Sequence, residues 1–355
     1  MSKNANLNKA GITKNDEFYT QLFDIENQLK HYKHHFKNKV ILCNCDDPYE
    51  SNFFRYFAMN FEELGLKKLI STCYSPSAVA GRLFPVDLDF HGANKAYVAI
   101  MREFTRDEMG GASWEWIKDH LNKGKNEVCE LNGNGDFRSP ECIEFLKEAD
   151  IVVTNPPFSL IREYIAQLFE YKKNFIIIGP KSVVTYKETF PLLKDNKMWI
   201  GYPFNNGNAY FYVPNGKEED FAKGVFDTET NIAKFRNCNW YTNLDIKKRH
   251  EDIILTRWYD DWGEEEYPFY DNYNAIEVGR LAIIPRDYEG VMGVPITIMD
   301  KLNPEQFEII GITNHGEMAG IPFVNNCFAE VNGKRKYVRV FVKNLKCEKK
   351  IKYDF

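Results

Sequence analysis

The sequence predicts an α/β protein in which a doubly wound, mostly parallel sheet is followed by a C-terminal α+β region. Two observations lead to this fold class. Short apolar runs alternate with segments whose apolar residues recur every three or four positions, as strands and helices do along a parallel sheet. Beyond about residue 200 the pattern changes to short strands among Gly, Asn, Pro and aromatic residues. We therefore expect one domain over residues 1–200 and a second over residues 201–355.

The elements of the first domain follow from local signals. Helices are predicted where apolar residues share one face and a cap or a glycine marks an end, at residues 21–36 (after Thr20, a candidate N-cap), 51–64, 139–148 and directly after Phe158. Strands are predicted at four apolar runs whose length suits burial on both faces, at residues 40–43, 69–74, 151–154 and 175–180. Residues 83–101 are interpreted as an inserted hairpin, with its clearest strand at residues 96–101.

The composition is that of a globular protein. Of its 355 residues, 44% are hydrophobic and 27% are charged, which excludes a disordered or fibrous chain. Because the net charge is −5, nucleic-acid binding would have to come from a local surface. Neither the eight cysteines nor the histidines show metal-ligand spacing, so we expect no metal site. The absence of a long apolar run and of a signal-peptide pattern predicts a cytoplasmic protein without a membrane partner.

The most informative tetrapeptide is Asn155-Pro156-Pro157-Phe158, which directly follows a predicted strand. Its prolines fix two φ angles and remove two N–H donors, so the turn offers two acceptors, the Asn155 side-chain oxygen and the Pro156 carbonyl. Two acceptors that take both N–H bonds of a base's exocyclic amine would localise its lone pair, which could then attack an electrophilic methyl group. Phe158 could stack on the same ring, as enzymes that extrude a base require. The alternative is a structural turn in which Asn155 caps the next helix.

These residues resemble a known family. Residues 155–158 are similar to the catalytic motif of S-adenosylmethionine-dependent N6-adenine methyltransferases. Three further blocks, at residues 14–20, 43–54 and 303–309, resemble the EcoRI-type adenine-specific DNA methyltransferase family, and the similarity spans nearly the whole chain. The resemblance implies a Rossmann-like class I methyltransferase fold, S-adenosylmethionine as cofactor and double-stranded DNA as substrate. The order of the motifs resembles that of the gamma group of amino-methyltransferases.

The resemblance also implies roles for single residues. Asn155, Pro156 and Phe158 are implied as catalytic, and Asn155 also borders the cofactor. The other implied cofactor residues are Phe18, Tyr19 and Thr20 at the methionine part, Asp46, Asp47 and Pro48 in the first cofactor motif, and Asp136 and Phe137 near the adenine. Each of these segments has a simpler interpretation as a turn or a lead-in to a helix. Their shared order along the chain favours the cofactor interpretation.

The loop after the first strand departs from the family pattern. The usual glycine-rich loop is replaced by residues 47–53, which contain no glycine. Without glycine the backbone cannot freely use positive φ or approach a ligand closely. The second strand ends in Thr72-Cys73-Tyr74, so no carboxylate is available there for the ribose hydroxyls.

A basic segment near the C-terminus is the candidate DNA-binding surface. Nine Lys or Arg and a single acid lie between Lys334 and Lys352, around a predicted strand at residues 336–342. Such a strand can contact phosphates even in an acidic protein. The candidate contacts are Lys334, Arg335, Lys336 and Arg339. The alternative is a solvated basic tail.

The sequence therefore predicts a site-specific DNA adenine-N6 methyltransferase that transfers the methyl group directly to a flipped-out adenine. A methyltransferase of the same fold that acts on RNA or on a protein glutamine is an alternative, because the motif serves other planar amines. A catalytically silent nucleic-acid-binding module on a Rossmann-like scaffold is another, and the loop without glycine is compatible with it. The DNA recognition sequence stays open, as does a cognate restriction endonuclease that acts on the same site without binding this chain.

Overall fold

The computed structural model describes residues 18–45, 47–75, 95–107, 110–111, 113–214 and 216–349. The chain divides into two compact units, each built from two segments. The first unit combines Met1–Lys181 with Gly201–Leu244, and the second combines Ser182–Ile200 with Asp245–Phe355. A single boundary near residue 200 is therefore wrong as a description of the packing, because residues 201–244 return to the first unit.

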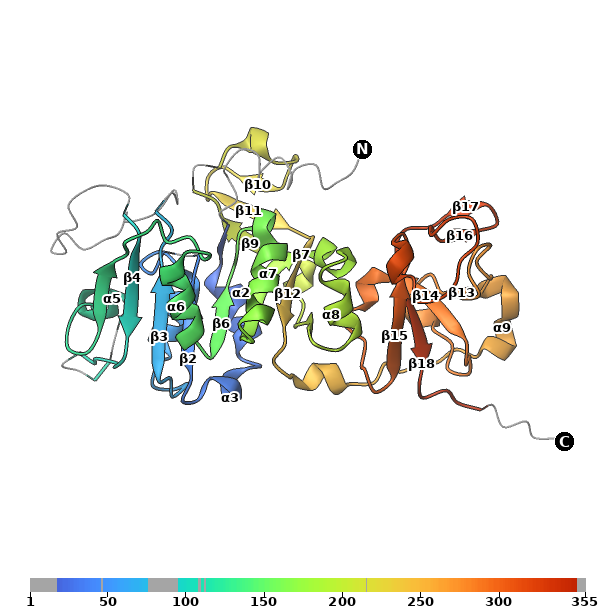
Figure 1. Ribbon diagram of the computed structural model, residues 1–355, viewed down its shortest axis with the longest axis horizontal. Coiled ribbons are helices and arrows are strands. Elements are labelled where there is room, and N and C mark those ends of the chain that lie inside the picture. The colour runs from blue at the N-terminus through green and yellow to red at the C-terminus, as the bar shows by residue number, and fades with distance from the viewer. Residues whose placement is uncertain are drawn as a thin grey trace. The chain divides into compact units, whose positions relative to one another are not determined.

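The first unit is built on a large mixed sheet (Figure 1). Within the first unit its strands follow the order β5-β4-β3-β2-β6-β7-β12. The four central strands are mutually parallel and confirm the four predicted runs: β3 (Lys68–Thr72), β2 (Val40–Cys43), β6 (Ile151–Thr154) and β7 (Asn174–Pro180). The outer pairings are antiparallel and are made by β4 (Tyr97–Met101), β5 (Glu127–Glu130) and β12 (Cys238–Thr242). The sheet is thus mixed, and parallel pairing is confined to its centre.

The strand predicted at residues 96–101 is present but belongs to the main sheet instead of an inserted hairpin. All five residues of β4 are buried, as are all four of β2. An apolar run buried on both faces predicts a strand, but it carries no information on which strands it pairs with. The first part of the expected hairpin, residues 83–94, lies outside the described residues.

Six helices in the described part of the first unit lie before or between these strands. They are α2 (Leu22–Leu29), α3 (Lys33–Phe36), α4 (Asn52–Met59), α5 (Trp114–His120), α6 (Pro140–Glu148) and α7 (Ile161–Glu170), of which α4 and α7 connect neighbouring central strands. The Ser51 hydroxyl caps α4 by accepting from the amides of Phe53 and Phe54. The predicted helix over residues 21–36 is divided into α2 and α3, and its N-cap is Gln21, whereas Thr20 lies in a strand. Helices α6 and α7 cover the face of the sheet that is turned toward the viewer in Figure 1.

The order of the central strands creates a switch point at β2. The chain passes from β2 through α4 to β3 on one side, and from β6, the other neighbour of β2, through α7 to β7. Because these strands are parallel, their carboxyl ends meet at one edge of the sheet. Ligands of open α/β sheets bind at this edge, next to the switch point.

A smaller antiparallel sheet completes the first unit. Its order is β1-β9-β11-β10, with β1 (Tyr19–Thr20), β9 (Ala209–Tyr212), β11 (Ile232–Phe235) and β10 (Phe226–Asp227). Pairing of β1 with β9 brings residues 209–212 beside the N-terminal strand.

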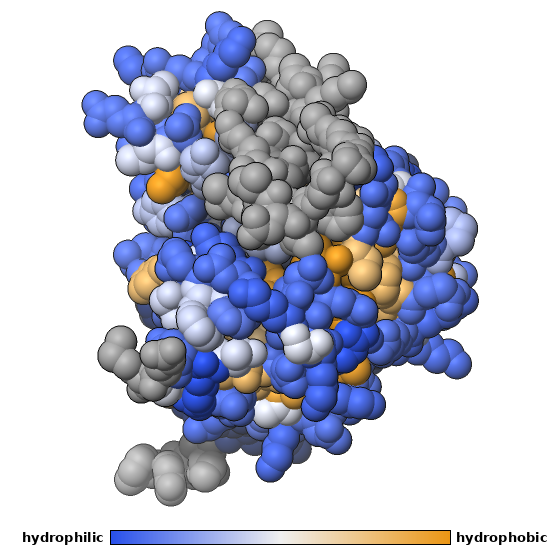
Figure 2. Space-filling model, turned by 90° about the vertical axis from the view of Figure 1, so that its left-hand side faces the viewer, coloured by the Kyte–Doolittle hydropathy of each residue, from blue (hydrophilic) through white to orange (hydrophobic). Residues whose placement is uncertain are grey.

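Hydrophilic residues cover most of the surface at the end of the unit that carries α5 and β5 (Figure 2).

The second unit contains a four-stranded sheet of order β13-β14-β18-β15. Its elements are α8 (Phe190–Lys194), β8 (Trp199–Ile200), α9 (Tyr259–Glu266), β13 (Ile276–Glu277), β14 (Val291–Pro295), β15 (Phe307–Ile312), β16 (Glu330–Val331), β17 (Lys334–Arg335) and β18 (Arg339–Asn344). The aromatic core between them includes Tyr270, Tyr273 and Phe341. No helix among the described residues of the chain is both long and apolar enough to cross a bilayer.

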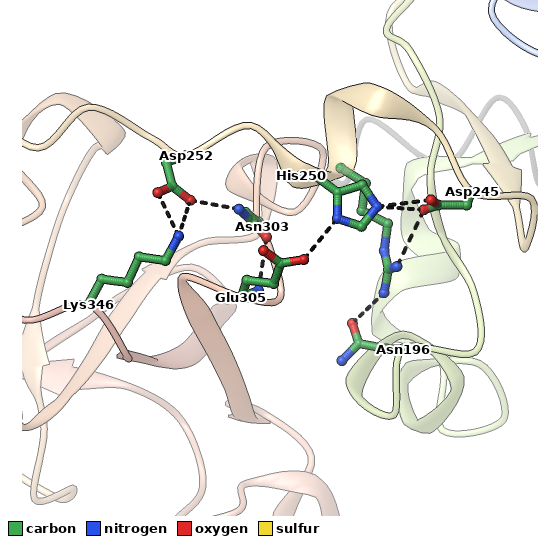
Figure 3. Close-up of polar contacts among 8 residues, drawn as sticks. Asn196, Asp245, His250, Asp252, Asn303, Glu305 and Lys346 are labelled. Atoms are coloured by element: carbon green, nitrogen blue, oxygen red, sulfur yellow. Dashed lines mark hydrogen bonds and ion pairs between the residues drawn. The ribbon is translucent and has the colours of Figure 1, made fainter.

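The block at residues 303–309 has a structural role in the second unit. Asn303 donates to Asp252 at 2.7 Å, and Lys346 pairs with the same carboxylate at 2.7 Å (Figure 3). His250 lies between Asp245 at 2.9 Å and Glu305 at 3.1 Å. Hydrogen bonds from both carboxylates raise the pKa of His250. This block therefore fastens residues 245–252 to the body of the second unit.

Candidate functional site

The predicted turn at residues 155–158 stands at the carboxyl edge of the main sheet. It leaves β6 and enters α7 through a single 3-10 turn at Phe158–Leu160. Leu160 donates its amide to the Pro157 carbonyl at 3.0 Å. The strand before the tetrapeptide and the helix after it are both present as predicted. The two prolines stiffen the turn, so the structure at its two ends decides where it points.

The Asn155 side chain is fixed by a hydrogen bond at its nitrogen, and its oxygen is available to a ligand. Its side chain is buried, and its Nδ2 donates to the Phe18 carbonyl. Its Oδ1 is also buried and accepts no hydrogen bond from any residue that the structure describes. The alternative in which Asn155 caps the following helix is wrong, because neither the 3-10 turn nor α7 receives a side-chain cap. A buried acceptor without a donor costs roughly 1–3 kcal/mol, so this oxygen is typical of a group kept for a ligand.

An aromatic cluster surrounds Phe158. The Phe18 ring lies 5.8 Å from those of Phe158 and Phe211, and 5.2 Å from that of Phe235. Sequence reasoning missed the last two residues, because they belong to the segment assigned to the second domain. The alternation in β9, where Ala209 and Phe211 are buried and Tyr210 is exposed, is the local signal that could have found them. Phe18 thus holds the Asn155 amide through its carbonyl and packs on Phe158 through its ring.

The predicted residues after β2 lie at the same edge. Asp47 is buried and accepts from the Tyr97 hydroxyl at 2.6 Å and from the Tyr49 amide at 2.9 Å. Burial raises the pKa of Tyr97, and the negative charge of the neighbouring Asp47 carboxylate raises it further. Pro48 is buried in the same turn, and Asp46 lies outside the described residues.

The turn after β2 uses a positive φ without a glycine. Cys45 adopts φ +70°, a conformation that non-glycine residues rarely take and that costs roughly 1–2 kcal/mol. Cys45 precedes the loop without glycine, and no residue of that loop, residues 47–53, has a positive φ. The chain makes the turn at a cost in strain.

The predicted segment around Asp136 closes against the end of β3. A Cβ atom on Gly135 would lie 1.9 Å from the Cys73 carbonyl oxygen, and Gly135 has φ +77°, so only glycine fits. Hydrogen bonds from Arg138 hold the pKa of Asp136 below its usual value. Phe137 is buried, 5.0 Å from the Tyr164 ring. The structure thus gathers the segments of Asp47, Asp136 and Asn155 at adjacent strand ends.

A pocket of about 510 Å³ opens between the small sheet, the turn after β2 and α5. Tyr19 lines it, whereas the buried Thr20 hydroxyl beside it has no hydrogen-bond partner in the described part of the chain. Two cations border the pocket, since the Arg55 guanidinium lies 5.8 Å and the Lys118 ammonium 5.9 Å from the Trp114 ring centre. Sequence reasoning identified Tyr19 but neither the cations nor Trp114.

The family model described as "Adenine-specific methyltransferase EcoRI" matches residues 6–346. The chain belongs to this family of methyltransferases. It is 44% identical over 353 residues to the Type II methyltransferase M.EcoRI of Escherichia coli, covering 98% of this chain and 100% of that protein. It is 34% identical over 350 residues to each of two relatives, M.MgeORF184P of Mycoplasma genitalium and M.MpnI of Mycoplasma pneumoniae, covering 95% of this chain and 98% and 97% of theirs. No solved structure matches. The predicted family is confirmed.

The candidate DNA contacts of this methyltransferase divide into two environments within the second unit. Lys334 and Arg335 are exposed in β17, behind a tight turn in which Asn332 and Gly333 have φ +51° and +68°, and Lys336, which follows, is half-buried. Arg339 is different, because its side chain is only 12% exposed and pairs with that of Glu277, 7% exposed, at 2.7 Å. The structure therefore commits Arg339 to an internal ion pair.

Proposed function

We propose that this methyltransferase transfers a methyl group from S-adenosylmethionine to the N6 amine of an adenine flipped out of double-stranded DNA. The observation that carries the proposal is the buried, unfilled acceptor Asn155 Oδ1, held in place from the other end of its amide by the Phe18 carbonyl. Family membership supplies the adenine and the methyl transfer. The relatives are named Type II methyltransferases, which supports DNA as the substrate and a place in DNA restriction-modification.

The chain's own residues would prepare the amine. Asn155 Oδ1 and the Pro156 carbonyl accept its two N–H bonds, which favours a pyramidal nitrogen with a localised lone pair. Phe158 stacks on the adenine ring and fixes its plane. Bound S-adenosylmethionine would supply the electrophilic methyl group, whose bond to sulfur breaks as the bond to N6 forms. The methylated amine then loses one proton to solvent. Because the transfer is direct, no covalent enzyme intermediate is needed. Orientation of the amine provides most of the rate enhancement.

The residues at the strand ends fit the cofactor. The buried Thr20 hydroxyl lacks a partner among the described residues and can donate to a carboxylate. Tyr19 borders the pocket with two cations, and Phe137 offers an apolar wall for an adenine ring. We assign cofactor binding to Phe18, Tyr19 and Thr20, to Asp46, Asp47 and Pro48, and to Asp136, Phe137 and Asn155.

We further propose a division of labour between the two units. The first unit, including residues 201–244, carries catalysis, and the second carries target recognition. Lys334, Arg335 and Lys336 are positioned on or next to a short hairpin and would contact phosphates. Arg339 is left out of this surface because its guanidinium is bound to Glu277. A cognate endonuclease would share the DNA site without binding this chain.

The test is transfer of radiolabelled methyl from S-adenosylmethionine to duplex DNA, duplex RNA and protein, followed by nucleoside analysis. Asn155→Ala should abolish transfer, and Asn243→Ala is the matched control. Asn243 is a half-buried amide that bonds the main chain of Lys173 and Phe175 at the opposite end of β7. N6-methyladenine in DNA from wild type and the control alone supports the proposal.

Other outcomes would redirect the assignment. Label in RNA or in a protein glutamine would keep the mechanism and change the substrate. Absence of transfer and of cofactor binding, with DNA binding intact, would favour the silent binding module. Full activity of Asn155→Ala would contradict the assigned role of its side chain.

A further inference from the structure

The end of β2 is bonded to both ends of the catalytic turn. Asn44, the residue directly after β2, is only 3% exposed. Its main-chain carbonyl accepts from the Thr154 hydroxyl, and its side-chain oxygen accepts from the Tyr164 hydroxyl. Thr154 directly precedes Asn155, and Tyr164 belongs to the first part of α7, the helix that the turn enters. One buried residue at the switch point of the sheet therefore contacts the turn's entry and its exit.

Tyr164 extends this connection to the predicted cofactor loop. Its side chain is 1% exposed, and its ring lies 5.0 Å from that of Phe137 at an interplanar angle of 67°. The Tyr164 side chain thus contacts Asn44 at the end of β2 and Phe137 in the predicted cofactor segment. Its backbone belongs to α7, the helix that follows the catalytic turn. Hydrogen bonds inside such a dry site are not exchanged for bonds to water, so they restrain geometry more strongly than surface bonds do.

We propose that Asn44 and Tyr164 are positioning residues for methyl transfer. They would set the location of Asn155 Oδ1 and Phe158 relative to the strand end that binds the cofactor. The turn itself is stiff because of its two prolines, so an error at either end moves the whole turn as one body. A misplacement of about 1 Å can cost on the order of 100-fold in rate. This inference rests on the proposed function, because it concerns the same reaction.

The first test compares Tyr164→Phe with Tyr32→Phe. Both replacements remove a buried tyrosine hydroxyl that bonds a side-chain amide, since Tyr32 accepts from Gln28 at 3.0 Å on α2. The measurement is the single-turnover rate of methyl transfer to duplex DNA with enzyme in excess, which separates chemistry from product release. We expect about a tenfold fall in this rate for Tyr164→Phe and less than a twofold change for Tyr32→Phe. We expect the KM for DNA to change less than twofold in both, and thermal unfolding to report any shared loss of stability.

The second test uses the other end of the turn. Thr154→Val removes the hydroxyl that bonds Asn44, whereas Thr154→Ser keeps it, so the serine variant should recover most of the rate lost in the valine variant. Because both bonds fix the same turn, Tyr164→Phe and Thr154→Val should be non-additive in a double-mutant cycle. Single-turnover rates within twofold of wild type for folded Tyr164→Phe and Thr154→Val would overturn the inference. Failure of the proposed function is distinguishable, because wild type itself would then transfer no methyl to DNA.

Discussion

Arg339 is predicted to stabilise the fold through an ion pair and not to contact DNA. Its guanidinium makes three contacts of 2.7–3.1 Å with the Glu277 carboxylate, which also accepts from the Tyr270 hydroxyl. With the two side chains 12% and 7% exposed, Arg339→Ala would leave a buried carboxylate without its counter-charge. Breaking a buried pair in this way costs about 3–5 kcal/mol. We therefore expect Arg339→Ala to lower the free energy of unfolding of the second unit by that amount.

Lys334→Ala is the matched control for this prediction. Lys334 is exposed on β17, so its removal should change the free energy of unfolding by less than about 0.5 kcal/mol. It should instead weaken DNA binding and reduce the slope of log K against log salt by about 1, as expected for one phosphate contact.

The assays are urea unfolding and DNA binding by fluorescence anisotropy between 50 and 200 mM salt, a range over which phosphate contacts change affinity by roughly orders of magnitude. The reasoning would be refuted if Arg339→Ala unfolded within about 1 kcal/mol of wild type while lowering the salt slope. That pattern would mean that Arg339 leaves Glu277 to contact DNA, and that the pair contributes little to the fold.

Three further predictions concern the first unit. Gly135→Ala should destabilise the protein by at least about 2 kcal/mol and raise the KM for S-adenosylmethionine, because its Cβ would meet the Cys73 carbonyl at 1.9 Å; a wild-type melting curve and KM would contradict this. Cys45→Gly should relieve the strain of φ +70° and stabilise the protein by up to about 1 kcal/mol in urea unfolding, whereas a loss of stability would show that the thiol's packing outweighs the strain. Burial raises the pKa of Asp24 from 3.8 to about 6, so its contribution to the free energy of unfolding is greatest below pH 4 and falls as the pH rises to 6. Asp24→Asn should remove this pH-dependent loss of stability, which is of order 3 kcal/mol. A pH profile of unfolding that is the same in the variant and in wild type would refute the raised pKa of Asp24.

The chain's local patterns were sufficient to predict the turn at residues 155–158 and the strands around it. Two adjacent prolines after an apolar run define a rigid turn whatever lies elsewhere in the protein, because they act on their own φ angles and donors. The four central strands were found for a similar reason, since each is a short apolar run bounded by polar residues. The family followed from the order of such motifs and was confirmed by the match over residues 6–346.

Other features depended on partners that are distant in sequence. Nothing near Phe18 indicates that its carbonyl will hold Asn155, and nothing near Arg339 indicates Glu277. The partners of β4 were missed because a strand buried on both faces does not indicate in its own sequence which strands it pairs with.

The sequence by itself determined a rigid turn with two acceptors after a buried strand, and through its motifs the family to which the chain belongs. Tertiary structure alone decided that Asn155 Oδ1 has no hydrogen-bond donor among the described residues and that Arg339 forms an internal ion pair. It also decided that β9 and β11 join the N-terminal strand in one sheet. The physical reason is that φ angles, caps and apolar spacing act within a few residues. Burial and hydrogen-bond partnership, in contrast, are properties of the packed chain.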